Sequence, residues 1–163
     1  MAERDELVEH AQQYEAVVGG SQLPTKPSKQ LAVVACMDSR IDVFALFGLK
    51  LGEAHVIRNA GGIITDDVLR SLTLSQRLLG TREVAILQHT KCGLHELDEE
   101  QLRSDIEAQG SAVPPWPFGS FSDVKVSVRD AVEAVRNSPF VPHTDAVSGF
   151  VYDVETGHLS EEA

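Results

Sequence analysis

Residues 31–40 have the sequence LAVVACMDSR, an uninterrupted apolar run that ends in a cysteine, an aspartate and an arginine at intervals of two. Such a run is typical of a strand that is buried on both faces of a parallel sheet. Cys36 at its end has two interpretations. It is either a small buried hydrophobic residue, or a metal-bound or nucleophilic thiolate supported by the charges of Asp38 and Arg40.

Strands and helices are predicted to alternate along the rest of the chain. Further strands are predicted over residues 54–57, 84–87 and 150–154, and a turn before His158 and Leu159 predicts a short edge hairpin. Helices are predicted over 41–47, from an N-cap at Thr65 to a C-cap at Gly80, over 98–108, and from an N-cap at Asp123 to Pro139. The fold class is therefore α/β, with a central, mostly parallel sheet of about four strands plus the edge hairpin, flanked by helices.

The chain is predicted to be a single domain over residues 1–163 with an amino-terminal arm. Residues 1–18 have apolar side chains at helical spacing, and Gly19 and Gly20 are expected to end that helix. A linker with two prolines follows, up to residue 30. The arm, residues 1–30, is expected to pack on a partner subunit.

The composition excludes several classes of partner. Acidic residues outnumber basic ones by 25 to 14, which gives a formal net charge of −11. This charge repels nucleic acid and anionic membrane surfaces. The sequence has no apolar run near the ~20 residues of a membrane span, and its acidic beginning is unlike a signal peptide. We expect a cytoplasmic protein, in which two cysteines serve a metal or a reaction rather than a disulfide.

Three side chains with metal-binding chemistry follow two predicted strands. Cys36 follows the first strand, and His89 and Cys92 follow the third in the sequence HTKC. Parallel strands bind ligands at their carboxyl ends, and two thiolates with one imidazole form a catalytic zinc set with an open fourth position. Gly62 and Gly93 are expected to allow close backbone approach. The alternative is a pair of buried thiols and a hydrogen-bonded histidine.

Other cysteine chemistries fit the spacing less well. The phosphate loop of thiol phosphatases needs an arginine where this chain has Asp42. A thioredoxin-type centre needs Cys-x-x-Cys, whereas Cys36 and Cys92 are 56 positions apart.

Three motifs, ACMDSR, HVIRNAGG and QHTKCG, resemble those of the β-class carbonic anhydrase family in order and spacing. The resemblance implies one Zn²⁺ per subunit held by Cys36, His89 and Cys92, and zinc-hydroxide attack on a small linear electrophile. The expected reaction is the reversible hydration of carbon dioxide to bicarbonate, a lyase activity. The family also implies a homodimer or a dimer of dimers with active sites at the dimer interface.

The resemblance also assigns roles to two charged residues of the first motif. Asp38 would accept a hydrogen bond from the zinc-bound water, and Arg40 would pair with Asp38 and keep it ionised. Asp38 is therefore interpreted as an orienting group rather than the main base. In some members the pair breaks and the aspartate becomes the fourth zinc ligand, and we hypothesise the same possibility here. Arg58 and Asn59 are expected to organise the sheet edge.

Two departures from the family pattern leave the substrate open. Pro27 replaces a glutamine found in larger members, and Leu94 replaces a glycine, so the pocket is expected to be less polar. The same motifs resemble carbonyl sulfide hydrolases, and hydrolysis of carbonyl sulfide is the alternative function. A remote alternative is a zinc-stabilised assembly protein without catalysis, in which His95 or Asp38 closes the site.

Overall fold

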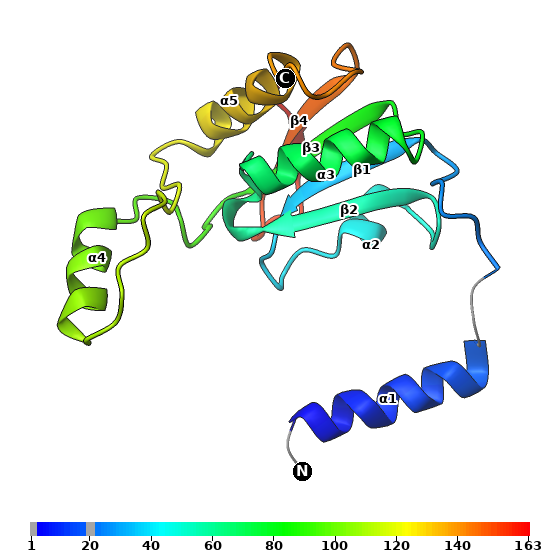
Figure 1. The fold of residues 1–163 in the computed structure, drawn as a ribbon, viewed down its shortest axis with the longest axis horizontal. Helices are drawn as coiled ribbons and strands as arrows, with labels where there is room; N and C mark the ends of the chain where they lie inside the picture. The colour runs from blue at the N-terminus through cyan, green and yellow to red at the C-terminus, as the bar shows by residue number, and fades with distance from the viewer. Residues whose placement is uncertain (1–2, 19–21) are drawn as a thin grey trace.

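Five strands form one sheet in the order β2-β1-β3-β4-β5 (Figure 1). This computed structural model of the chain describes residues 3–18 and 22–163. Four strands run parallel and the short last strand is antiparallel to its neighbour, which confirms the predicted α/β fold and its edge hairpin. The strands are β1 (Leu31–Cys36), β2 (Ala54–Asn59), β3 (Glu83–His89), β4 (Val147–Tyr152) and β5 (Leu159–Glu161).

Five α-helices and one short 3-10 helix occupy the described residues between and before the strands. The two predicted N-caps are present, since Thr65 accepts a hydrogen bond from Val68 and Asp123 accepts one from Lys125. Gly48 adopts a left-handed conformation at the end of another helix. The helices are α1 (Glu3–Val18), α2 (Val43–Phe47), η1 (Ala60–Gly62), α3 (Asp66–Arg77), α4 (Glu99–Ala108) and α5 (Val124–Arg136).

The sheet separates two apolar layers because successive strand residues face opposite sides. On one side, Val34 and Ile86 belong to a cluster that includes Leu72 of α3 and Val132 of α5. On the other side, Leu87 belongs to a second cluster with the segment around α2. All four named side chains of the first cluster are fully buried. Because β1 and β3 are packed on both faces, the positions of their carboxyl ends are fixed by the core.

Several predicted boundaries are wrong. The fourth strand begins at Val147 rather than at Phe150, and it ends at Tyr152. Gly149 lies inside it because α5 packs directly on the strand, where an added Cβ would be 2.8 Å from a methyl group of Val132. Helix α3 ends at Arg77, so Gly80 does not cap it directly, although Gly80 has a left-handed φ of 77°.

Helix α1 stands away from the sheet in Figure 1, and every side chain described for residues 3–16 is exposed. Gly19 and Gly20, predicted to end this helix, lie outside the described residues. The packing of α1 on a partner stays a prediction. Among the described helices, none has the length and apolar character that crossing a membrane requires.

Candidate metal centre

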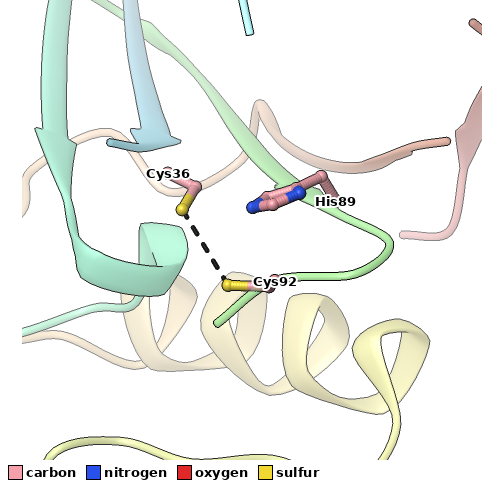
Figure 2. Close-up of side chains that lie close together, drawn as sticks. All are labelled: Cys36, His89 and Cys92. Carbon is pink, nitrogen blue, oxygen red and sulfur yellow. Dashed lines mark hydrogen bonds between the residues drawn. The ribbon is translucent and has the colours of Figure 1, made fainter. Parts of the chain in front are cut away.

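Cys36, His89 and Cys92 meet at the point where the order of strands along the sheet reverses. The chain passes from β1 to β2 on one side and then to β3 on the other, so the carboxyl ends of β1 and β3 flank a switch point. One ligand atom from each of the three residues lies within 4.8 Å of the other two, and all three residues are buried (Figure 2). The predicted juxtaposition of these side chains is present.

The donor geometry fits a tetrahedral zinc ion. The Sγ atoms of Cys36 and Cys92 are 3.9 Å apart. Zinc–sulfur bonds of ~2.3 Å at a tetrahedral angle place two sulfurs about 3.8 Å apart. Nδ1 of His89 lies 2.8 Å from the carbonyl of Thr90, while its buried Nε2 has no hydrogen-bond partner among the described residues. With Nδ1 as the donor, Nε2 offers a lone pair, and a metal ion satisfies it.

The two sulfurs influence each other's ionisation. The hydrogen bond from Cys92 lowers the pKa of Cys36 to about 4. The same contact raises the pKa of Cys92, because a second negative charge beside the first is unfavourable and the site is buried. Cys36 is therefore the thiolate that binds a cation first, and the charge of the bound cation favours deprotonation of Cys92 as well.

Arg40 holds the Asp38 carboxylate beside the three ligand candidates. Nε and Nη2 of Arg40 donate to the two carboxylate oxygens of Asp38 at 2.9 and 2.7 Å, and Nη2 also donates to the Lys91 carbonyl at 3.0 Å. This fork holds the pKa of Asp38 far below its ordinary value. Asp38 Oδ2 is 3.7 Å from Nε2 of His89. An ionised hydrogen-bond acceptor thus lies next to the site.

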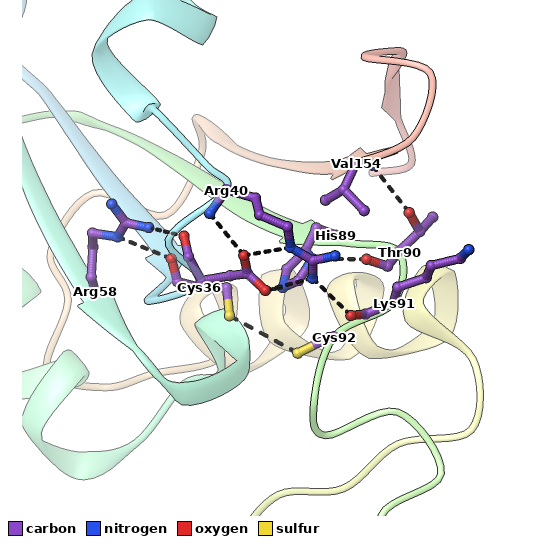
Figure 3. A network of polar contacts seen from close by, with 9 residues as sticks. Cys36, Arg40, Arg58, His89, Thr90, Lys91, Cys92 and Val154 are labelled. Atoms are coloured by element: carbon purple, nitrogen blue, oxygen red, sulfur yellow. Dashed lines mark hydrogen bonds and ion pairs between the residues drawn. The ribbon is translucent and has the colours of Figure 1, made fainter.

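Arg58 and Asn59 hold the backbone around the site, as predicted. Arg58 donates to the carbonyl of Cys36 at 3.0 Å and to that of Asp38 at 2.7 Å (Figure 3). Asn59 makes two hydrogen bonds with the backbone of Ile63, at 2.8 and 3.1 Å. These bonds connect the end of β2 to the ends of the neighbouring strand and loop.

Only one of the two glycines has the expected close approach. A Cβ on Gly62 would lie 2.8 Å from the nitrogen of Cys36 and 2.9 Å from the carbonyl oxygen of Leu87. The expectation for Gly93 is wrong, since nothing lies within 4 Å of a Cβ built there.

His95 is turned away from the cluster. Its Nε2 is 3.0 Å from the carbonyl of Ser122, and its backbone forms an isolated bridge with Phe121. With Asp38 held by Arg40, neither residue proposed to close the site is positioned as a fourth ligand. The hydrogen bond from Arg40 to the Lys91 carbonyl was not predicted, because every residue type has a backbone carbonyl and the sequence does not show which one accepts.

Two thiols and one imidazole lie together at the switch point, and a carboxylate held by an arginine lies beside them. This arrangement places the chain among the α/β proteins with a Cys2His metal centre. The sequence model of the carbonic anhydrase family matches residues 31–116. The chain is 48% identical to β-carbonic anhydrase 1 of Mycobacterium tuberculosis over 139 residues, which cover 85% of each protein. It therefore belongs to the β-carbonic anhydrase family.

Solved structures and other relatives agree with this assignment. The carbonic anhydrase of Streptococcus mutans superposes with a TM-score of 0.93 at 38% identity, covering 100% of this chain and 99% of that one. A carbon disulfide hydrolase of Acidithiobacillus thiooxidans is 36% identical over 152 residues, covering 81% of this chain and 76% of the relative. The family thus includes proteins named for two different substrates.

Proposed function

We propose that this chain catalyses the reversible hydration of carbon dioxide, in which CO₂ and H₂O give HCO₃⁻ and H⁺. Membership of the β-carbonic anhydrase family supports this activity. The observation that carries it is the buried, unpartnered Nε2 of His89, which lies with the sulfurs of Cys36 and Cys92 in one 4.8 Å cluster. A site of this kind serves an apolar gas better than a large polar substrate.

One Zn²⁺ per subunit would be held by Cys36, His89 and Cys92. When bound, the metal would supply activation of water as a nucleophile at neutral pH. The carbonyl of Thr90 fixes the imidazole orientation through Nδ1, 2.8 Å away. Burial of all three ligands excludes bulk water from the ligand side of the site.

Asp38 would orient the attacking water by accepting one of its hydrogens. Because Arg40 keeps the carboxylate ionised, Asp38 accepts a hydrogen bond and has little tendency to take the proton itself. The fork from Arg40 also restrains Asp38 from turning toward the metal. Release of that fork, with Asp38 as a fourth ligand, remains our hypothesis for an inactive state, and metal spectroscopy that shows unchanged coordination across pH would contradict it.

The assembly and location are also proposals. We infer a homodimer or a dimer of dimers of single-domain subunits, residues 1–163, with the arm of residues 1–30 packed on the partner. Its support is the exposure of every side chain described for residues 3–16. A cytoplasmic location is supported by the two free thiols, Cys36 and Cys92, which stay reduced there.

Hydrolysis of carbonyl sulfide or carbon disulfide is the second candidate. The 36% identity to a carbon disulfide hydrolase supports it. These molecules are linear, apolar and electrophilic at carbon, as carbon dioxide is. Leu94 also favours an apolar site, since its Cδ1 lies 2.6 Å from the position of a Cβ on Gly61 in η1.

Parallel assays on protein of known zinc content test these proposals. We expect about one zinc per chain, rapid hydration of carbon dioxide, and slower release of hydrogen sulfide from carbonyl sulfide. Cys36→Ser should lose zinc and at least about 1,000-fold of the activity, because the serine hydroxyl stays protonated at neutral pH and is a poor zinc ligand. Met37→Leu, at an exposed neighbour, is the matched control and should retain both. Full activity without a transition metal would refute the proposal, and faster sulfide release would favour the second candidate.

A further inference from the structure

A cavity lies on the opposite side of the sheet from the metal centre. It has a volume of about 420 Å³ and lies between α5, the residues after η1 and the segment that precedes α5. Ile63, Ile64 and Val126 form apolar parts of its wall. Its volume falls within the range of small-molecule sites.

A buried amide marks the inner end of this cavity. Gln88 lines it and is only 1% exposed, and its Oε1 has no hydrogen-bond partner among the described residues. Its Nε2 is already directed to the carbonyl of Gly62, at 3.4 Å. A buried carbonyl oxygen without a donor is costly, which indicates that a donor is supplied by something that enters the cavity.

The polar part of the wall is acidic. Asp123 and Asp130 line the cavity with the hydroxyl of Ser127, and no Lys, Arg or His is among the described residues that line it. Both hydrogen bonds that Asp123 accepts as the N-cap of α5 go to Oδ1. Its pKa is lowered by these bonds, so the carboxylate is charged at neutral pH.

Two of the three basic residues of α5 pair with an acid near the end of the chain. Lys125 and Arg129 face Glu162, with nitrogen–oxygen distances of 2.8 and 3.7 Å. Their charges still contribute to the lowered pKa of Asp123, but among the described residues that line the cavity there is no basic side chain to pair with Asp130. Helix α1 is a poor occupant for such a cavity, since it contains five acidic residues and one basic residue.

We propose that this cavity binds a small organic cation, a primary amine with an apolar body. The ammonium group donates to Gln88 Oε1 and faces the two carboxylates, while the body packs on the isoleucines. The site is separate from the metal centre, and its occupancy does not depend on the proposed activity.

Titration of the zinc-loaded full chain with 2-phenylethylamine tests this site. NMR should show saturable shifts in the methyl groups of Ile63, Ile64 and Val126. The neutral isostere 2-phenylethanol should bind at least about tenfold more weakly, because a charged hydrogen bond is lost. Equal affinity of amine and alcohol would overturn the proposal, as would shifts confined to the surroundings of Cys36 and His89.

Variants of the cavity complete the test. Asp130→Asn preserves the shape and removes one charge, and Gln88→Leu removes the acceptor. Each should weaken binding of the amine roughly fivefold to tenfold. Asp145→Asn, an exposed acid outside the cavity lining, should leave the affinity unchanged. Unchanged affinity in both cavity variants, with zinc content and folding intact, would reject the assignment.

Discussion

The metal centre and the α4 arm, residues 98–121, are held in place by different forces. The three ligand candidates are nearly fully buried: Cys36 is 3%, His89 1% and Cys92 7% exposed. Cys36 and His89 end β1 and β3, two strands that are packed on both faces, and Cys92 follows β3. Helix α4 has no buried residue and projects from the sheet in Figure 1. Apolar burial thus positions the site, whereas the arm depends on directional polar bonds.

Two side chains organise the arm. The carboxylate of Glu99 accepts hydrogen bonds from the backbone of Phe118, Gly119 and Ser120 at 2.8–3.0 Å. Arg103 donates to two carbonyls of the same loop and lies 5.0 Å from the ring centre of Phe118. Damage to the site region should therefore lower the stability of the whole fold, while damage to the arm should stay local.

Gly62→Ala should give the largest effect on folding. Gly62 has a φ of 61°, and an added Cβ would press on the backbone of β1 and β3. We expect the free energy of unfolding to fall by about 3 kcal/mol. Denaturant unfolding measures it, with Gly93→Ala as the unhindered control. Equal stabilities of the two variants would mean that the close approach is unimportant.

Arg40→Gln should lower turnover with little change in folding. Loss of the fork leaves Asp38 free to rotate, and removal of such a supporting group costs about 10- to 100-fold in activity. Carbon dioxide hydration kinetics with parallel zinc analysis measure the loss. Arg70→Gln, on the exposed face of α3, should behave as the unchanged chain. Undiminished turnover in Arg40→Gln would show that Asp38 needs no restraint.

Glu99→Gln should loosen the arm alone. A neutral amide replaces a carboxylate that accepts three backbone hydrogen bonds. Hydrogen exchange at the amides of residues 118–120 should become roughly fivefold faster, while exchange in β1 and β3 stays the same. Glu100→Gln is the neighbouring control. Faster exchange throughout the sheet would show that the arm and core unfold together.

Acid should produce the smallest change in the same loop. Its backbone hydrogen bonds lower the pKa of Glu99 below the ordinary value. A lowered pKa stabilises the folded arm above the unfolded value of about 4.3 and loses this contribution as pH falls through the folded pKa. Protection factors at residues 118–120 should therefore decline only below about pH 4. A decline between pH 8 and 6 would point to another group.

The sequence predicted the central strands and the metal cluster because both depend on short patterns. An apolar run defines each strand, and the ligand candidates follow strand ends that must share one edge of a parallel sheet. The start of β4 was missed because Ser148 and Gly149 interrupt the apolar pattern. Gly149 is explained only by the nearby α5, a contact between segments that no local pattern records.

The contacts made by backbone atoms were equally invisible in the sequence. Arg40 is steadied by the Lys91 carbonyl, 51 positions away, and Glu99 by amides about 20 positions away. Such partners depend on how loops close in three dimensions. The unpaired Oε1 of Gln88 was also not predictable, since residue type alone does not show which buried amides have hydrogen-bond partners.

Gln88 and His89 are consecutive residues of β3, yet the pleat sends one side chain to each side of the sheet. A substitution at position 88 therefore changes the cavity lined by α5, whereas a substitution at position 89 changes the metal centre. The two sites can be altered independently, although their residues are neighbours in the sequence.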